Sequence, residues 1–274
     1  MIKLIISDMD GTLLNDAHEL HPDFWKMEEL LHEQGIRFAV ASGRQYYNLL
    51  ERFEQLKERM IFFSENGTHV VHKGEELYIN KLDTPAAHNF VKIGREIPGV
   101  QLVLCCKNTA YVETRDQDFI KEIKKYYARL EYVEDLTKIE DDILKVTICD
   151  NSGVETNSYH AFKEFEKDYK VAIAARIFLD ITSITANKGN AIKEVQKKLG
   201  IASKEIIVFG DYLNDLEMVQ NVENSYAMKN AHPEIIKAAS FVTKWDNNEN
   251  GVLQTIAELK LIQEKAEVVK SKEL

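Results

Sequence analysis

Short apolar runs alternate with amphipathic stretches in the N-terminal third of the chain. Residues 3–7, 36–41 and 60–64 are mostly apolar and are predicted to form buried strands. Residues 21–34 and 44–53, which lie between them, carry apolar side chains at helical spacing. Strands that alternate with helices favour a parallel sheet with right-handed crossovers, and such sheets bind ligands at the carboxyl ends of their strands.

The same alternation returns in the C-terminal third, so both ends of the chain are predicted to share one sheet. Strands are expected at residues 205–209, 225–228 and 241–243, and helices at residues 189–199, 213–221 and 233–238 and from Gly251 onward. Residues 68–71 and 76–79 are predicted to form a hairpin around Gly74.

The middle of the chain has a different order of predicted helices and strands. Helices are expected at residues 86–96, 118–130 and 156–169, and strands at residues 100–105, 110–113, 143–149, 171–175 and 178–182. We therefore predict an α/β protein with a Rossmann-like, doubly wound parallel sheet as its core, formed by residues 1–82 and 185–274. Residues 83–184 are predicted to form an inserted α+β module. The charged tail, residues 264–274, is expected to fray.

The composition indicates one or two folded domains. The chain has 274 residues, with hydrophobic and charged fractions of 45% and 29% that are near the averages of globular proteins. A formal net charge of -10 disfavours a nucleic-acid partner, because the overall field would repel the phosphate backbone. The apolar runs are much shorter than the roughly 20 residues that span a bilayer, so no membrane partner is expected.

The cysteines and the first residues indicate the compartment. Cys105, Cys106 and Cys149 lie in apolar segments without metal-ligand spacing, and we interpret them as reduced core side chains. The first apolar run is a few residues long and ends in acid, so no signal peptide is expected. These features predict a soluble cytoplasmic protein, and we expect a monomer.

Two acidic clusters follow predicted strands. Asp8 and Asp10 come after residues 3–7, and Asp211 and Asp215 come after residues 205–209. Because the carboxyl ends of parallel strands meet at one edge of a sheet, the two clusters can converge on one cation. Magnesium is commonly held by one or two carboxylates together with phosphate and water, so Asp8 and Asp211 would suffice. Each cluster alone is more often a solvated turn, and it is their pairing that points to a site.

Two further segments have features of an anion site. Ser42 and Gly43 stand where a predicted strand passes to a helix, a position that binds anions, although Ser42 could simply cap the helix. Lys188 opens another predicted helix and could pair with a phosphate, although a lone lysine is usually a solvated surface residue. All these signals lie at strand ends or helix starts of one sheet, and together they indicate a site for phosphate and a metal ion.

Taken in order, these segments resemble the four motifs of the haloacid dehalogenase (HAD) superfamily. The matching segments are Asp8-Met9-Asp10-Gly11-Thr12-Leu13-Leu14, Ser42-Gly43-Arg44, Lys188-Gly189 and Gly210-Asp211-Tyr212-Leu213-Asn214-Asp215. The insertion at residues 83–184 resembles the cap domain of its Cof-type phosphatases (subfamily IIB), which contributes to substrate specificity. Asn66-Gly67 and residues 247–252 extend the resemblance over most of the chain.

The resemblance implies a magnesium-dependent phosphatase that hydrolyses small phosphate monoesters through an aspartyl-phosphate. Asp8 would be the nucleophile, and Asp10 would be the general acid and then the general base. Asp10 lies two residues further on, which would place it on the same side of the strand end as Asp8. The remaining roles implied are magnesium binding by Asp8, the Asp10 backbone carbonyl and Asp211, phosphate binding by Met9, Ser42, Gly43, Lys188 and Asn214, and support by Thr12 and by Asp215, which would orient Lys188.

Sugar phosphates and nucleotide-like cofactors, such as pyridoxal phosphate or flavin mononucleotide, are the expected substrates. A phosphomutase, which would pass the phosphoryl group to another hydroxyl, is one alternative. A non-catalytic sensor of a phosphorylated metabolite is another, but binding alone does not need an acid at Asp10. A nicotinamide-dependent oxidoreductase is disfavoured, because no Gly-x-Gly-x-x-Gly segment follows a predicted strand.

Overall fold

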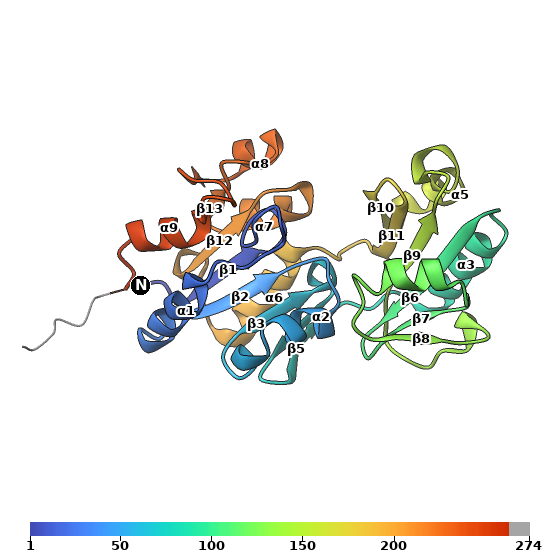
Figure 1. The fold of residues 1–274 in the computed structure, drawn as a ribbon, viewed down its shortest axis with the longest axis horizontal. Coiled ribbons are helices and arrows are strands. Elements are labelled where there is room, and N and C mark those ends of the chain that lie inside the picture. Colours follow the sequence, from blue (N-terminus) through green and yellow to red (C-terminus); the bar gives the residue numbers. More distant parts are fainter. Residues whose placement is uncertain (263–274) are drawn as a thin grey trace, which may run out of the picture.

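The computed structural model describes residues 1–262 and contains two sheets, which Figure 1 shows as two neighbouring groups of elements. The larger sheet has eight strands in the order β14-β13-β12-β1-β2-β3-β4-β5, and the smaller has six in the order β10-β11-β9-β6-β7-β8. The chain passes from the larger sheet to the smaller after β5 and returns after β11. The predicted fold class, a doubly wound α/β core with an α+β insertion, is confirmed. The boundaries at residues 82/83 and 184/185 stay a prediction, and the expected fraying of residues 264–274 lies outside the described residues.

Both ends of the chain contribute to the larger sheet, as the sequence predicted. Its strands are β1 (Leu4–Asp8), β2 (Arg37–Ala41), β3 (Ile61–Ser64), β4 (His69–His72), β5 (Glu75–Ile79), β12 (Ile206–Gly210), β13 (Asn224–Ala227) and β14 (Phe241–Val242). The helices of this part are α1 (Asp23–Glu33), α2 (Tyr46–Arg52), α6 (Lys188–Leu199), α7 (Leu216–Asn221), α8 (Pro233–Ala238) and α9 (Gly251–Glu258). All strand pairs from β14 to β3 are parallel, and the β4–β5 hairpin joins the sheet by antiparallel pairing of β4 with β3 and of β5 with β4.

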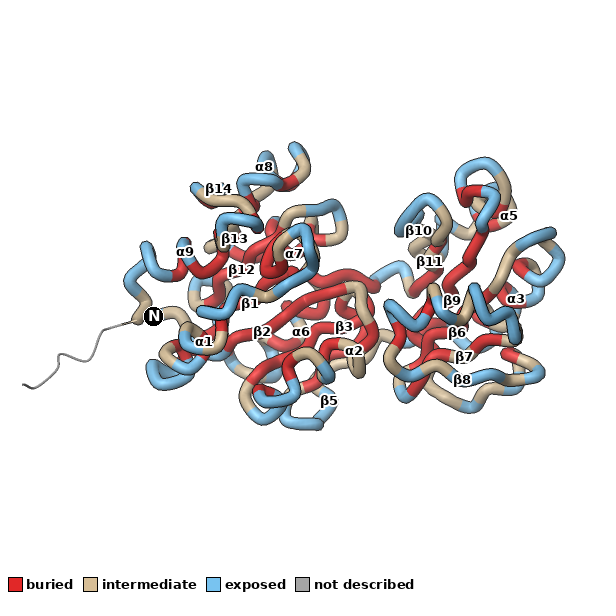
Figure 2. The backbone as a smooth tube through the Cα atoms, in the orientation of Figure 1, coloured by how far each residue is buried: buried red, intermediate tan, exposed pale blue. Residues whose placement is uncertain are grey.

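Strand β1 lies in the middle of the larger sheet because its residues are apolar on both faces. Leu4, Ile5 and Ile6 are fully buried, and β1 pairs in parallel with β2 on one side and β12 on the other. A strand covered on both faces needs consecutive apolar residues, which is what the sequence provides. Figure 2 shows these central strands as buried. The carboxyl end of β1 is therefore flanked by the carboxyl ends of β2 and β12, and Asp8 is its last residue.

The smaller sheet is mostly antiparallel. Its strands are β6 (Val100–Cys106), β7 (Ala110–Val112), β8 (Leu130–Tyr132), β9 (Ile143–Asp150), β10 (Tyr169–Ala175) and β11 (Phe178–Ser183), and its helices are α3 (Thr84–Arg95), α4 (Gln117–Ile123) and α5 (Tyr159–Phe162). Only the β7–β8 pair is parallel. Val146 and Ile148 of β9 pack with Phe90 of α3 and Phe162 of α5 in one apolar cluster. Since side chains alternate along a strand, Lys145 and Thr147 belong to the opposite face.

Two predicted helices of the insertion are wrong in extent. The helix expected over residues 118–130 ends at Ile123, because Leu130 pairs with Ala110 as the first residue of β8. The helix expected over residues 156–169 is broken into α5 and short 3₁₀ turns, and Tyr169 already belongs to β10. In both cases strand pairing, a long-range contact, overrides the local helical spacing. Within residues 1–262 the 3₁₀ turns are Glu54–Leu56, Glu65–Gly67, Leu136–Lys138, Val154–Thr156, Lys163–Lys167, Ser203–Glu205 and Leu213–Asp215.

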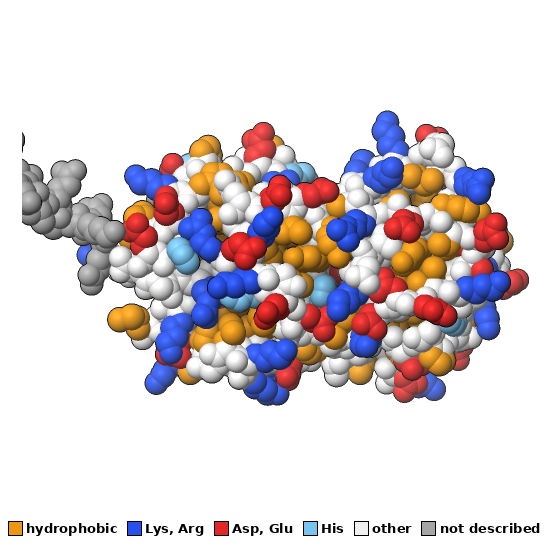
Figure 3. All heavy atoms as spheres, turned by 90° about the horizontal axis from the view of Figure 1, so that it is seen from below, with side chains coloured by type: hydrophobic (Ala, Val, Ile, Leu, Met, Phe, Trp, Pro, Cys, Tyr) orange, Lys and Arg blue, Asp and Glu red, His pale blue; other side chains and the backbone are white. Residues whose placement is uncertain are grey.

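The cysteine interpretation is confirmed, since Cys105, Cys106 and Cys149 are free and buried. Within residues 1–262, none of the helices has both the length and the apolar character needed to cross a membrane. On the face drawn in Figure 3, acidic and basic side chains are interspersed over both groups of elements.

Candidate active site

A buried lysine joins the two acidic clusters at the carboxyl edge of the larger sheet. The Nζ atom of Lys188 lies 2.5 Å from Oδ1 of Asp8 and 2.6 Å from Oδ1 of Asp215. Lys188 and Asp215 are fully buried, and Asp8 is 5% exposed. Asp215 also accepts hydrogen bonds through Oδ2 from the backbone N–H groups of Asp211 and Tyr212. The alternative in which Lys188 is a solvated surface residue is therefore wrong.

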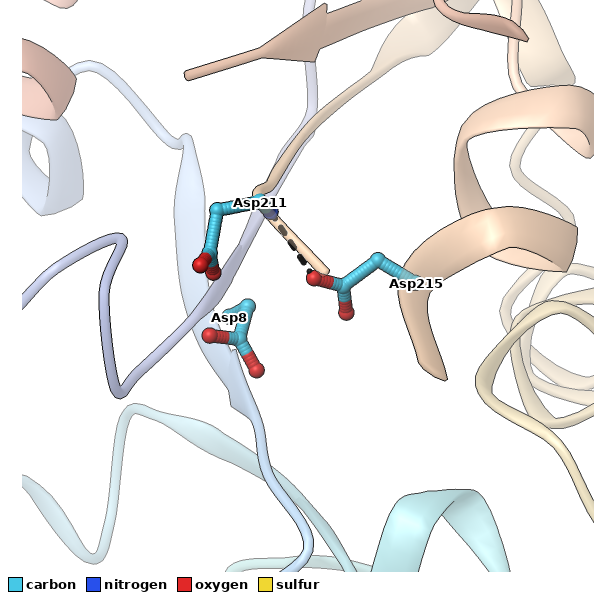
Figure 4. A group of neighbouring side chains, drawn as sticks. All are labelled: Asp8, Asp211 and Asp215. Carbon is cyan, nitrogen blue, oxygen red and sulfur yellow. Dashed lines mark hydrogen bonds between the residues drawn. The ribbon is translucent and has the colours of Figure 1, made fainter. Parts of the chain in front are cut away.

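Asp211 stands beside this lysine group and is held by the turn that follows β1. The Thr12 hydroxyl donates to Oδ1 of Asp211 over 2.7 Å. Gly11 has a φ of +84°, and a Cβ built on it would lie 2.5 Å from Oδ2 of Asp211, so only glycine fits. The glycine and threonine after Asp10 thus serve to bring the loop after β1 against the loop after β12. Figure 4 shows the carboxylates of Asp8, Asp211 and Asp215 directed toward one another.

The acids outnumber the single ammonium group at this edge, which changes their titration. Burial, reinforced by the negative charge of Asp215, raises the pKa of Asp8 well above its ordinary value, although Lys188 opposes the shift. Burial raises the pKa of Asp211 to about 6, against the hydrogen bond from Thr12. Burial would lower the pKa of Lys188, but the charges of Asp215 and Asp8 prevail and raise it, so the lysine stays charged.

These residues fit a divalent cation. One carboxylate oxygen from each of Asp8, Asp211 and Asp215 lies within 4.8 Å of the others. Three carboxylates and one ammonium leave an excess of negative charge in a buried place, which a cation would compensate. The donor atoms are all carboxylate oxygens, which suit magnesium better than zinc. Asp215 is a member of this acidic cluster in addition to its contact with Lys188.

The Asp10 carboxylate has partners outside this group. Arg44 holds it with two hydrogen bonds, from Nη2 to Oδ1 at 2.7 Å and from Nε to Oδ2 at 3.0 Å, and His18 lies 3.1 Å away. Burial would raise the pKa of Asp10, but Arg44 and His18 outweigh it and the pKa is lowered. Because β1 ends at Asp8, strand alternation does not reach Asp10, and the argument that placed both carboxylates on one side of the strand end does not hold.

The residues expected to bind phosphate lie in loops that hold one another. The Asn66 N–H donates to the Ser42 carbonyl over 2.9 Å, and the Asn66 Oδ1 accepts from Nδ2 of Asn214 over 3.1 Å. A Cβ on Gly43 would lie 3.2 Å from the Asn66 amide group, so these loops pack closely. The Met9 side chain is fully buried in the core, which leaves only its backbone for a ligand. The loops after β2, β3 and β12 therefore form one connected structure.

Ser42 does not cap a helix. Helix α2 begins at Tyr46, its N-cap residue is Gln45, and the Ser42 hydroxyl instead accepts from the Arg44 N–H over 3.2 Å. The alternative in which Ser42 is simply a capping residue is therefore wrong. Its role in phosphate binding, like the roles of the other predicted site residues, stays a prediction.

The sequence assigns no role to several polar residues at this edge. Arg44 is part of a motif, but its contact with Asp10 joins two loops that are distant in the chain, so the sequence does not predict it. Glu65 precedes Asn66, and its buried carboxylate lies 2.8 Å from Nζ of Lys145 in the smaller sheet. Asn66-Gly67 after an apolar strand indicates this loop in the sequence. Lys145, the partner of Glu65, lies 80 residues further along the chain, so no local pattern predicts their contact.

Comparison with known proteins agrees with this geometry. A family model described as haloacid dehalogenase-like hydrolase matches residues 5–256. Over 258 residues the chain is 34% identical to the 5-amino-6-(5-phospho-D-ribitylamino)uracil phosphatase YbjI of Escherichia coli (strain K12), covering 93% of this chain and 95% of that protein.

Solved structures share the whole fold. One from Eubacterium rectale is 27% identical, covers 94% of this chain and 99% of its own, and superposes with a TM-score of 0.86. The structure of an HAD subclass IIB sugar phosphatase has a TM-score of 0.80 at 19% identity, with coverage of 95% and 100%. The latter likeness concerns the fold alone.

The Lys188→Met variant tests the electrostatics of the site. Removing the ammonium leaves buried carboxylates unpaired, so we expect the free energy of unfolding at pH 7 to fall by about 3–5 kcal/mol. The pKa values of Asp8 and Asp211, which Lys188 lowers, would then rise further in the folded state. Such groups contribute stability below their unfolded pKa and lose it as pH rises, so the deficit should shrink between pH 7 and pH 5. Urea unfolding of both proteins without divalent metal at the two pH values measures this.

Lys193→Met is the matched control, because Lys193 lies on the same helix and is exposed. Its effect should stay within about 0.5 kcal/mol at both pH values. A Lys188→Met deficit no larger than that of the control, or one that grows on acidification, would contradict the buried charge pairing described above.

Proposed function

Because the chain belongs to the haloacid dehalogenase-like hydrolase family and is a phosphoric monoester hydrolase, we propose that it dephosphorylates a hydroxyl-rich small molecule through an aspartyl-phosphate on Asp8, with magnesium as cofactor. The observation that carries the proposal is the buried contact of Lys188 with Asp8, beside Asp211 and Asp215. This arrangement supplies a nucleophile, a positive charge and oxygen ligands at a single sheet edge.

Asp8 attacks phosphorus in the first step. A bond forms between a carboxylate oxygen of Asp8 and phosphorus while the bond to the leaving oxygen breaks, and Asp10 gives that oxygen a proton. In the second step Asp10 takes a proton from water, the water oxygen bonds to phosphorus, and the bond to Asp8 breaks. Inorganic phosphate leaves and both carboxyl groups return to their starting forms. Lys188 offsets the charge that would otherwise repel a phosphate dianion from Asp8.

The acid role of Asp10 requires that it holds a proton, which its contact with Arg44 opposes. A phosphate dianion binds a guanidinium through the same two-pronged hydrogen bonds as a carboxylate. We therefore include in the proposal that the substrate phosphate competes with Asp10 for Arg44. Release from Arg44 would let the pKa of Asp10 rise toward the range needed for proton transfer.

Magnesium would be held by the side chains of Asp8 and Asp211 and by the Asp10 backbone carbonyl, close to Asp215. When bound, the ion supplies positive charge that stabilises the phosphoryl oxygens. The rigid placement of Asp211 by Thr12 and Gly11 supports this assignment, since magnesium demands near-octahedral geometry.

The substrate class is proposed from the Escherichia coli relative, which is named for a phosphorylated ribitylaminouracil. That compound joins a phosphorylated sugar alcohol to a pyrimidine ring, so it belongs to the nucleotide-like phosphates expected from the sequence. Sugar phosphates stay within the same proposal, because they share the primary phosphate ester and the hydroxyl-bearing carbon chain.

Phosphate release from 5-amino-6-(5-phospho-D-ribitylamino)uracil tests the substrate. We expect release of inorganic phosphate, and we expect Asp8→Asn to lower kcat by more than about a thousandfold because the nucleophile is lost. Asp168→Asn, which changes an exposed carboxylate just before β10, is the control and should match the wild type. An Asp8→Asn variant that keeps more than a tenth of the activity would exclude Asp8 as nucleophile, and transfer of phosphoryl to an added sugar instead of water would favour a phosphomutase.

Removal of divalent metal tests the cofactor. Chelation should abolish hydrolysis of p-nitrophenyl phosphate, magnesium should restore it, and zinc should restore little, because the site offers oxygen ligands only. Magnesium should also raise the midpoint of thermal unfolding of the wild type, since it binds the folded state. Asp211→Asn should remove that shift. Full activity in excess chelator, or the same shift in the variant, would contradict this site.

The Asp10→Asn variant separates the two halves of the reaction. Nitrophenolate needs little protonation, so the first step with p-nitrophenyl phosphate should be less impaired than with an alkyl phosphate. Hydrolysis of the aspartyl-phosphate has no such relief, so the variant should release about one equivalent of nitrophenol per enzyme in a burst and then turn over slowly. Stopped-flow absorbance measures the burst. Uniform slowing of both substrates without a burst would mean that Asp10 is not the acid and base.

A further inference from the structure

A buried charged cluster connects the smaller sheet with the edge that carries Asp8. Lys145 of β9 lies 2.8 Å from the carboxylate of Glu65, on the turn that follows β3, and 3.1 Å from Oδ2 of Asp180 on β11. The Thr147 hydroxyl donates to Oδ1 of Asp180 over 2.6 Å. Lys145, Thr147 and Glu65 are at most 5% exposed. We refer to Lys145, Thr147, Asp180 and Glu65 as the inter-sheet cluster.

The inter-sheet cluster lies close to the proposed reaction centre. Asp8 is in register with Ala41 of β2, and Ala41 is in register with Phe63 of β3, two residues before Glu65. Neighbouring strands are about 4.8 Å apart, so β1 and β3 are separated by roughly 10 Å. A phosphate bound at Asp8 would therefore place a leaving group several carbons long within reach of Glu65 and its partners.

The loop that presents Glu65 is conformationally strained. Glu65 and Asn66 have φ values of 48° and 56°, in the left-handed region that residues other than glycine seldom occupy. Such strain persists where surrounding contacts hold it, and it is often found at functional sites. Here Asn66 contacts Asn214, and the Glu65 N–H donates to the Arg44 carbonyl. This backbone conformation places the Glu65 carboxylate beside Lys145, while the backbone of Glu65 and the side chain of Asn66 contact the proposed phosphate-binding loops.

Docking of the two sheets does not depend on Lys145 alone. The Gln45 side chain exchanges two hydrogen bonds with the backbone of Arg129, and the Arg129 guanidinium lies 3.4 Å from the centre of the Tyr47 ring. These contacts hold the residue before β8 against the start of α2. A buried ion pair adds little to stability compared with apolar packing, so the inter-sheet cluster is better explained by recognition than by docking.

The inter-sheet cluster has more acceptors than donors. Glu65 and Asp180 are two carboxylates, against one ammonium and one hydroxyl, so the cluster carries a net charge of -1. Burial raises the pKa of Glu65, although the charge of Lys145 opposes the shift. Spare acceptors in a buried place favour a ligand that donates hydrogen bonds, and a net negative charge repels a ligand that is itself an anion.

We propose that the inter-sheet cluster recognises the leaving group of the substrate by accepting hydrogen bonds from the hydroxyls of a neutral polyol chain. Its net negative charge would disfavour substrates whose leaving group carries a negative charge in addition to the phosphate. This inference rests on the proposed function and deepens it. Glu65 and Asp180 act as specificity-determining acceptors, and Lys145 holds the two carboxylates together.

A matched pair of substrates tests the proposal. Ribitol phosphate and phosphoribonate have the same carbon chain and phosphate, but the second ends in a carboxylate. We expect the wild type to prefer ribitol phosphate by about tenfold or more in kcat/KM, because a like charge near the buried acids is unfavourable. Asp180→Asn and Glu65→Gln, which keep the shape of each side chain, should each lower this ratio by about tenfold. Comparing two substrates within one variant cancels differences in folding and active enzyme.

Glu217→Gln is the control, because Glu217 of α7 pairs with Lys170 of β10 at 3.7 Å but is half-exposed. Its ratio should stay within about twofold of the wild type, since solvent screens the lost charge. Equal losses on both substrates in Asp180→Asn and Glu65→Gln, with an unchanged ratio, would assign the cluster to docking and overturn the proposal.

The assay also separates this inference from the proposed function. A wild type that hydrolyses p-nitrophenyl phosphate but neither five-carbon substrate would refute the assigned leaving-group class while the phosphatase mechanism stands. A wild type that hydrolyses none of the three compounds in the presence of magnesium would refute the proposed function and with it the inference.

Discussion

The buried contact of Lys188 with Asp8 and Asp215 is the interaction on which the rest of the site depends. Three carboxylates meet at the end of a sheet where little water can solvate them, and one ammonium keeps them together. Such an assembly is electrostatically incomplete, because its negative charge exceeds its positive charge. This excess of negative charge fits a divalent cation, which in our proposal is magnesium and would offset the repulsion between these carboxylates and a substrate phosphate.

Glycines at two positions let neighbouring segments approach closely enough for this contact to form. A Cβ on Gly189 would lie 2.5 Å from the Glu217 carbonyl, so glycine lets α6 approach α7 and carries Lys188 into the site. Gly11 does the same for the loop that holds Asp211. At both positions a larger side chain would not fit between the two segments. Glycine therefore lets the backbone place the charged groups close together.

In our proposal, the smaller sheet contributes substrate selectivity and the larger sheet carries the reaction centre. The face of the smaller sheet opposite the α3 and α5 packing carries Lys145, Thr147 and Asp180, and Lys145 reaches Glu65 on the loop after β3. That loop also contacts the Ser42 and Arg44 carbonyls. The proposed recognition of the leaving group and the proposed phosphate-binding loops are thereby linked through the strained turn at Glu65 and Asn66.

The sequence by itself determined the α/β class, the common sheet of the two chain ends and the meeting of the acidic clusters that hold Asp8 and Asp211. These follow from apolar periodicity and from the rule that parallel strands end at one edge. The pairing of Lys188 with Asp215 was implied only by the resemblance to the HAD superfamily. Only the tertiary structure decided that Asp10 is bound by Arg44, that Glu65 faces Lys145, and that two helices of the insertion stop early. Those features depend on contacts between residues distant in the chain, and local spacing carries no information about which distant residue a side chain will meet.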